Sequence, residues 1–246
     1  MRNDPGGSVP HGLCIGCGYA SRYLKAGACA PGEVCIRAHS GRQIDRFLNA
    51  HRGEAEGYLA DLFWERRAIA ARYAPLIALD PLLDDPDEAV RRVIAQRLPE
   101  ERLGRLRRDP DREVRIAVAT RLPVEELAGM IDDPDYLVRA TVARRLPHGQ
   151  LKRLVNDPER EVRKAVAQRL PPFALALLAD DAEPEVRAIV AARALPSLAN
   201  RLLQDADWWV RLAALCRADL EQLPVLLDDP EAEIRRAAAS RLEREN

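Results

Sequence analysis

Four of the five cysteines lie close together near the start of the chain and could hold a metal centre. Cys14, Cys17, Cys29 and Cys35 have the spacing C-x₂-C-x₁₁-C-x₅-C. Four thiolates can bind a structural zinc ion or an iron–sulfur cluster. Five glycines lie within residues 11–36, and glycine lets backbone N–H groups turn toward sulfur and stabilise its negative charge.

The spacing of the cysteines leaves the kind of centre open. Zinc sites usually combine two short C-x₂₋₄-C pairs, whereas five residues separate Cys29 from Cys35. Iron–sulfur sites accept looser spacing, and a disulfide is the third possibility, which is rare in the cytoplasm. Cys216 lies far along the chain at an outward-facing helical position, and we interpret it as a free thiol.

Composition limits the compartments and partners to be considered. Hydrophobic residues make up 47% of the chain but aromatic residues only 4%, so the core must be aliphatic. The formal net charge of -1 argues against bulk attraction to nucleic acid or to an anionic membrane. No stretch approaches the ~20 apolar residues of a membrane span, and the start lacks the apolar run of a signal peptide. We therefore expect a cytoplasmic protein.

The elements that position these cysteines fall into two regions of different composition. Ten of the 13 glycines and four of the five cysteines lie in residues 1–60. We interpret residues 1–60 as a Cys/Gly-rich cluster domain with a capping helix, and residues 61–246 as a separate solenoid. The segment from Gln43 to Tyr73 has a helical pattern and would cover the first repeat of that solenoid.

A strict 24-residue period runs through the second region. Aspartate recurs at the same place in every unit: Asp61, Asp85, Asp109, Asp133, Asp157, Asp181, Asp205 and Asp229. Self-similarity at such a period is typical of stacked structural repeats.

Each 24-residue unit predicts one helix followed by a tight turn. In the unit that begins at Asp85, this aspartate is a good N-cap, Pro86 fits the first helical position, and Pro99 ends the helix. The aliphatic residues between them are four apart and would be buried: Val90, Ile94 and Leu98. The next pair of leucines is three apart, as in a single turn of α- or 3₁₀-helix. No segment alternates like a strand, so we expect an all-α fold.

The repeated pattern D-P-x-x-x-V-R-x-x-V-A-x-R-L-P-x-x-x-L-x-x-L resembles the leucine-rich repeat variant family. The resemblance implies a right-handed superhelical solenoid of alternating α- and 3₁₀-helices. The chain departs from the pattern at Arg66, which replaces the valine of the first unit, and at Leu195–Pro196, which is displaced by one residue.

Some members of this family carry an N-terminal four-cysteine segment that binds a 4Fe–4S cluster, and residues 8–50 resemble that segment. The resemblance implies that Cys14, Cys17, Cys29 and Cys35 are the cluster ligands.

Two arginines of each helix flank its apolar stripe, and they decide between two classes of function. Arg91 and its equivalents follow an acidic residue by four positions, but an exposed pair of this kind contributes only ~0.3–0.5 kcal/mol. We therefore expect each of these guanidinium groups to reach the acidic cap of an adjoining unit. Arg97 and its equivalents lie near helix C-termini, where carbonyls are unpaired. The alternative is that both series grip the phosphates of a nucleic acid.

We found no catalytic motif and expect no enzymatic activity or catalytic residues. The chain has no G-x-S-x-G, phosphate loop or H-E-x-x-H. A local anomaly suggests binding instead: Trp208, Trp209 and Leu212 lie toward the outward arc, where sister units carry polar residues, and exposed aromatics are enriched at interfaces. The sequence therefore predicts a cytoplasmic scaffold that binds another protein and carries a structural, redox or sensing cluster. A nucleic-acid-binding repeat protein and an electron-transfer subunit of a redox enzyme are the alternatives.

Overall fold

The computed structural model describes residues 12–244, and almost all of its regular structure is helical. Within that range the only extended pairing is an isolated bridge between Ala30 and Val34. The chain divides into two compact units, Met1–Arg121 and Leu122–Asn246. No helix in the described part of the chain is long and apolar enough to cross a membrane.

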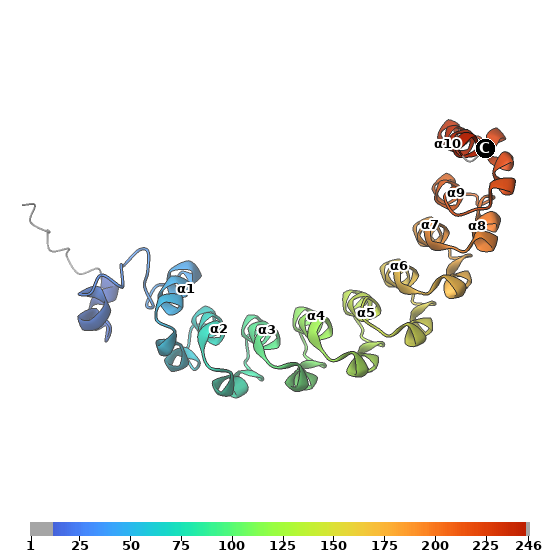
Figure 1. Ribbon diagram of the computed structural model, residues 1–246. Helices are drawn as coiled ribbons and strands as arrows, with labels where there is room; N and C mark the ends of the chain where they lie inside the picture. The colour runs from blue at the N-terminus through green and yellow to red at the C-terminus, as the bar shows by residue number, and fades with distance from the viewer. Residues whose placement is uncertain (1–11, 245–246) are drawn as a thin grey trace, which may run out of the picture. The chain divides into compact units, whose positions relative to one another are not determined.

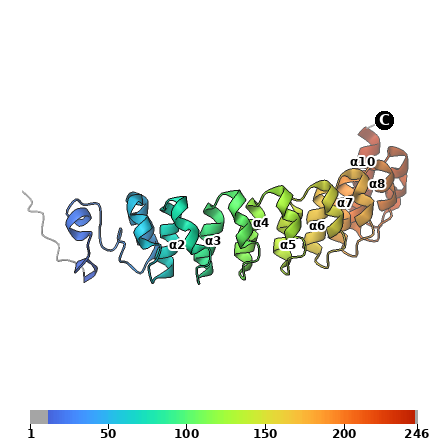
Figure 2. The same cartoon turned by 90° about the horizontal axis from the view of Figure 1, so that it is seen from below.

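The first unit alternates α-helices with tight 3₁₀-helices. After a short 3₁₀ turn at Gly12–Cys14 and a π-helical turn at Ala20–Leu24, its elements are α1 (Gly41–Ala50), η3 (Arg52–Tyr58), α2 (Trp64–Tyr73), η4 (Leu76–Leu82), α3 (Glu88–Arg97), η5 (Glu100–Leu106) and α4 (Arg112–Arg121). The α-helices lie side by side in one layer and the 3₁₀-helices form a second layer (Figure 1). Figure 2 shows α2 to α4 with their axes in similar directions.

The second unit repeats this alternation. Its elements are η6 (Val124–Met130), α5 (Tyr136–Ala143), η7 (His148–Leu154), α6 (Arg160–Arg169), η8 (Pro172–Leu178), α7 (Pro184–Arg193), α8 (Pro196–Leu202), α9 (Trp208–Leu215), η9 (Leu220–Asp228) and α10 (Ala232–Arg244). The all-α repeat architecture expected from the 24-residue period is therefore confirmed.

The aliphatic stripe of each repeat is its core. In the repeat that begins at Asp85, five aliphatic side chains are buried: Val90, Ile94, Leu98, Leu103 and Leu106. Complete burial of such a side chain stabilises the fold by about 1.5–3 kcal/mol. Because each repeat is too thin to bury both its faces, this burial requires a neighbouring repeat.

The start of each helix differs from the prediction. The N-cap of α3 is Asp87, whose carboxylate accepts the N–H of Ala89 at 3.0 Å, and not Asp85. Asp85 lies two residues earlier, is buried, and accepts the N–H of Asp87 at 2.9 Å. Pro86 therefore lies in the turn before the helix. The predicted end is correct, since α3 stops at Arg97.

The alternation of helices is irregular near Pro196, and it starts earlier in the chain than predicted. The repeat with the displaced Leu195–Pro196 has an α-helix, α8, where the other repeats have a 3₁₀-helix. The segment predicted to be helical from Gln43 to Tyr73 contains most of α1, which begins at Gly41, and all of η3 and α2. The alternation thus begins before residue 61. The composition boundary near residue 61 falls inside the first unit, and the proposed division into domains stays a prediction.

Candidate functional site

The repeated arginine of each helix links its own repeat to the next one. Arg91 donates from Nε to Oδ2 of Asp109 at 2.7 Å and from Nη2 to Oδ1 at 3.0 Å. Its Nη1 donates to the main-chain carbonyl of Asp85 at 2.6 Å. The side chains of Arg91 and Asp109 are only 10% and 3% exposed. The expectation that this guanidinium reaches an aspartate of the adjoining 24-residue repeat is confirmed.

This bidentate geometry recurs along both units. The equivalent pairs are Arg67–Asp85, Arg139–Asp157, Arg163–Asp181, Arg187–Asp205 and Arg211–Asp229. Two parallel charge-assisted hydrogen bonds fix both distance and orientation. Asp61 of the first repeat is the exception, because it pairs with Arg66 of its own repeat at 2.8 Å.

The ion pairs shift the pKa values of both partners. Burial tends to raise the pKa of Asp181, but the hydrogen bonds from Arg163 and from the Glu183 N–H outweigh it, so the pKa lies below its usual value. The hydrogen bond to Asp181 in turn raises the pKa of Arg163, against the effect of burial. Both groups therefore stay charged over the whole neutral range.

The second series of arginines points to the preceding repeat. Arg97 donates to the carbonyls of Ala71 at 2.6 Å and Ala74 at 3.1 Å, at the C-terminal end of α2. The series continues in both units: Arg121 to Ala95, Arg145 to Leu122, Arg169 to Arg144, Arg193 to Ala167, Arg217 to Ala192 and Arg241 to Leu215. Free carbonyls at helix ends attract positive charge. The two arginines of one helix thus hydrogen-bond to the repeats before and after it. Their guanidinium groups are bonded within the protein.

The cysteine segment is a succession of tight turns packed against α1. Cys14 ends the first 3₁₀ turn, and the N–H of Cys17 donates to its carbonyl at 3.1 Å. Cys35 is buried, and its N–H donates to the carbonyl of Gln43 in α1 at 3.2 Å. Three glycines among the cysteines have positive φ values of 69°, 68° and 92°: Gly16, Gly27 and Gly32. Only glycine adopts this backbone without strain.

Cys29 lies within electrostatic reach of the other three cysteines of the segment. Burial, followed by the negative charge of the thiolates of Cys35, Cys14 and Cys17, raises the pKa of Cys29 to about 11. None of the five cysteines forms a disulfide. No three His, Cys, Asp or Glu side chains in residues 12–244 are grouped closely enough to hold one metal ion.

One carboxylate holds the cysteine segment against η3, just before the first repeat, and the sequence did not predict this contact. Glu54 of η3 accepts hydrogen bonds from the hydroxyls of Tyr19 at 2.9 Å and Tyr23 at 2.7 Å, and from Arg22 at 3.0 Å. The ring of His51 stacks on Tyr23 at 3.9 Å between centroids. The sequence did contain one indication of this contact: Tyr19 and Tyr23 lie close together in a chain that has only 4% aromatic residues.

The predicted partner patch is only partly one surface. Trp209, 55% exposed, and Leu212 line a hollow of about 450 Å³ whose wall includes Ile189 of α7. Trp208, 39% exposed, lines a different hollow beside Val225. The two indole rings meet edge to face, with 5.2 Å between their centroids. Cys216 follows at the end of α9 and is exposed, as predicted.

A helical repeat protein, built from alternating α- and 3₁₀-helices with an arginine ladder between repeats, is the class that this geometry defines. Comparison with known proteins specifies the family. The family described as "Leucine rich repeat variant" matches residues 112–135, 136–159 and 160–183. A solved structure described as "a leucine-rich repeat variant with a novel repetitive protein structural motif" is 53% identical, covers 95% of this chain and 100% of its own, and has a TM-score of 0.91. The chain belongs to the leucine-rich repeat variant family.

A curated relative is more distant and matches only in part. It is an "Uncharacterized 27.7 kDa protein in nifB 3'region" of Rhodobacter capsulatus, 42% identical over 91 residues. The match spans 36% of this chain and 37% of the relative. An engineered protein of known structure covers 85% of this chain at 15% identity with a TM-score of 0.39.

Proposed function

We propose that this protein is a cytoplasmic, non-enzymatic scaffold that carries a 4Fe–4S cluster on Cys14, Cys17, Cys29 and Cys35 and binds a protein partner. The proposal is supported by four free cysteines in one segment of glycine turns that packs against α1, where the charges of Cys14, Cys17 and Cys35 act on Cys29. The cluster, when bound, supplies either a structural cross-link or a one-electron redox centre.

The spacing of the four cysteines supports a cluster over a zinc ion in this proposal. Zinc sites usually combine two short C-x₂₋₄-C pairs, whereas five residues separate Cys29 from Cys35. A 4Fe–4S cluster takes one thiolate per iron and therefore accepts sulfurs that are farther apart.

The surrounding residues have a positioning role in this proposal. Glu54 fixes the turn that follows Cys17 through Tyr19 and Tyr23. The main-chain bond from Cys35 to Gln43 fixes the other end of the segment on α1. These hydrogen bonds anchor the turn after Cys17 and the backbone at Cys35.

Anaerobic preparation with metal analysis tests the cluster. We expect a brown protein with about four iron and four sulfide per chain, and loss of colour in Cys14→Ser and Cys29→Ser. The matched control is Cys216→Ser, which removes an exposed thiol far along the chain and should keep the colour. A colourless anaerobic protein with one zinc per chain would refute the cluster.

The protein partner is proposed to bind at the hollow of Trp209 and Leu212. An exposed indole beside aliphatic side chains is typical of an interface anchor. An anaerobic pull-down with the wild-type chain and with Trp209→Glu tests this, and a partner retained equally by both would contradict it. The nucleic-acid alternative loses its main support, because the repeated arginines are engaged between repeats.

A further inference from the structure

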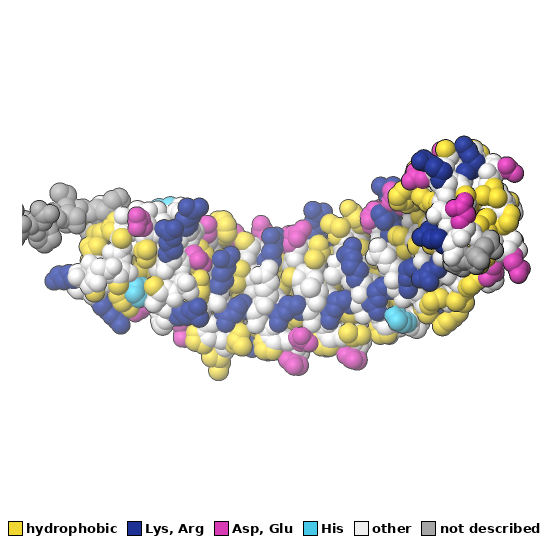
Figure 3. Space-filling model, turned by 45° about the horizontal axis from the view of Figure 1, so that its top comes forward, with side chains coloured by type: hydrophobic (Ala, Val, Ile, Leu, Met, Phe, Trp, Pro, Cys, Tyr) yellow, Lys and Arg dark blue, Asp and Glu magenta, His cyan; other side chains and the backbone are white. Residues whose placement is uncertain are grey.

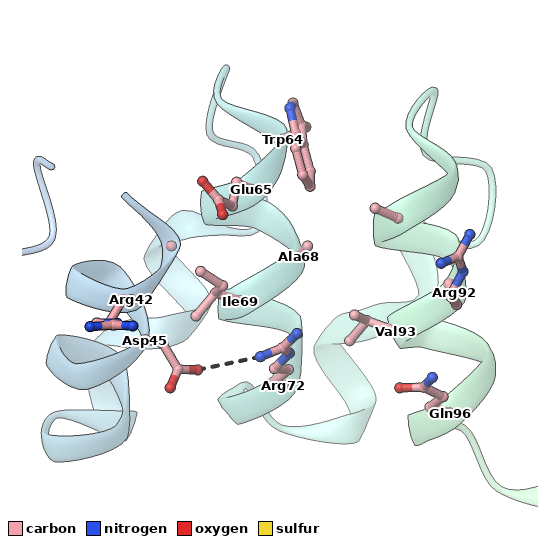
Figure 4. A pocket seen from close by; sticks show the side chains of 12 residues that line it. Arg42, Asp45, Trp64, Glu65, Ala68, Ile69, Arg72, Arg92, Val93 and Gln96 are labelled. Carbon is pink, nitrogen blue, oxygen red and sulfur yellow. Dashed lines mark ion pairs between the residues drawn. The ribbon is translucent and has the colours of Figure 1, made fainter. Parts of the chain in front are cut away.

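A hollow of about 460 Å³ lies on the α-helical face of the first unit, across α1, α2 and α3 (Figure 4). Trp64, 42% exposed, stands at its edge, and Ala68, Ile69 and Val93 supply apolar surface between the helices. This volume is in the range of sites that bind small molecules or a few residues of a peptide.

Three arginines from three helices line the hollow, and their donors are poorly satisfied. The side chain of Arg42 is exposed and has neither an ion pair nor a hydrogen bond among the residues that the structure describes. Arg72 approaches Asp45 only to 3.5 Å, and Arg92 approaches Asp111 only to 3.6 Å. The Nε of Arg92 is buried and has no acceptor within the described chain. Each guanidinium offers five N–H donors, so the hollow has an excess of donors.

The acidic residues of the same hollow are already engaged. Asp45 accepts the hydroxyl of Tyr73 at 2.9 Å as well as facing Arg72. The carboxylate of Glu65 packs on Gly41, so closely that a Cβ at Gly41 would collide with it. Gly41 is the first residue of α1, where free N–H groups stabilise negative charge. These acids therefore leave the arginines available for a further anion.

The arrangement of charge favours an isolated carboxylate over a phosphate backbone. Figure 3 shows the Lys and Arg side chains over α1 to α4 as separate patches, with uncharged and acidic side chains between them. Asp45 and Glu65 would repel a continuous row of phosphates, but they leave room for single carboxylates placed between guanidinium groups. Planar guanidinium groups bind carboxylates by paired hydrogen bonds.

We propose that this hollow binds an acidic peptide segment of a partner protein, with a carboxylate held among Arg42, Arg72 and Arg92 and an apolar side chain against Trp64. The site is separate from the hollow of Trp209 and does not depend on the cluster. The site would select short sequences that combine acidic and aliphatic residues, because the arginines that bind a carboxylate lie beside the apolar surface of the hollow.

Fluorescence anisotropy with labelled peptides tests the site. The probe is a fluorescein-labelled octapeptide that alternates leucine and glutamate, and its counterpart has glutamine in place of every glutamate. We expect the glutamate peptide to bind at least about tenfold more tightly at low salt. The double variant Arg72→Gln/Arg92→Gln should lose about tenfold in affinity for the glutamate peptide and none for the glutamine peptide.

A matched control and a competing ligand make the test decisive. Arg236 occupies the position of α10 that Arg92 occupies in α3, but it lies outside the hollow, so Arg236→Gln should bind as the wild type does. Circular dichroism and thermal melting establish that each variant is folded. Equal binding of both peptides, unchanged binding by the double variant, or tighter binding of a fluorescein-labelled single-stranded oligothymidine would overturn the proposal.

Discussion

Arg163 in α6 and Asp181 before α7 form a bidentate ion pair across two consecutive repeats. The Nε–Oδ2 and Nη2–Oδ1 distances are 2.7 and 2.9 Å, and the side chains are 12% and 4% exposed. Nη1 of the same arginine donates to the Asp157 carbonyl at 2.8 Å. One guanidinium therefore satisfies acceptors in two repeats, and its removal leaves the buried Asp181 carboxylate without its cationic partner, with only the Glu183 N–H still donating to it.

Removal of this guanidinium should strongly destabilise the fold. We expect Arg163→Gln to lower the free energy of unfolding by about 3 kcal/mol, as for other broken buried pairs. The control is Arg160→Gln, because Arg160 is half exposed and its carboxylate contacts are 3.7 Å or longer. Chemical denaturation monitored by circular dichroism measures both, and equal effects of the two substitutions would argue against a structural ladder.

The arginines that point backward should contribute less. Arg97 donates to two carbonyls that end α2, and hydrogen bonds from a charged donor contribute about 1.5–3 kcal/mol. Arg97→Gln should therefore cost about 2 kcal/mol, while Arg105→Gln, at a largely exposed position, should cost less than about 0.5 kcal/mol. A cost for Arg97→Gln no larger than that for Arg105→Gln would contradict this assignment.

Acid should weaken the arginine–aspartate ion pairs that link consecutive repeats. Burial tends to raise the pKa of Asp181 and Asp205, but hydrogen bonds from Arg163 and Arg187 leave both pKa values lowered. Since the pKa in the folded state lies below the unfolded value of about 3.9, folding favours the ionised form. This stabilisation is fully present above pH ~4 and is lost as pH falls through the folded-state pKa. Denaturation midpoints measured from pH 7 to pH 2 should fall steeply below pH ~4.

The variant Asp181→Asn separates this effect from general acid unfolding. It should be less stable than the wild type at pH 7, and the difference should shrink toward pH 2, where Asp181 itself becomes protonated. A difference that is constant with pH would show that ionisation of Asp181 does not contribute.

The sequence predicts the repeat, the aliphatic stripe and the linking arginines because each is periodic. A 24-residue period reveals both members of a pair even when they are 18 residues apart, as Arg163 and Asp181 are. The N-cap was misplaced because Asp85 and Asp87 are both good capping residues, and only the turn decides between them. The role of Glu54 could not be predicted, since it depends on tertiary packing of a segment that does not repeat.

Backbone conformation in the cysteine segment gives a separate prediction. Gly16 has a φ of 69°, and no atom lies within 4 Å of the place that an alanine Cβ would take. Gly16→Ala therefore introduces strain of about 1–2 kcal/mol without a steric clash, and we expect slower and less complete anaerobic loading of iron and sulfide. Gly12→Ala is the control, because Gly12 has no positive φ and equally open surroundings; similar loading of both variants would refute a role for the turn.

The exposed tryptophan gives a prediction on association. Trp209→Glu should keep the wild-type melting temperature, because the side chain is 55% exposed, and should abolish capture of the partner. Phe173→Glu is the control, since Phe173 is 79% exposed and lies outside the hollow of Trp209. Unfolding of Trp209→Glu would identify Trp209 as a core residue.

A double-mutant cycle on Arg163 and Asp181 tests the structural role of the ladder most directly. The free energy of unfolding is measured for the wild type, Arg163→Met, Asp181→Leu and the double variant. We predict a coupling energy of about 2 kcal/mol, so that the double variant is more stable than the sum of the single effects implies. A coupling energy within about 0.3 kcal/mol of zero, together with weaker binding to duplex DNA in Arg163→Met, would contradict the ladder and favour a polyanion-binding role.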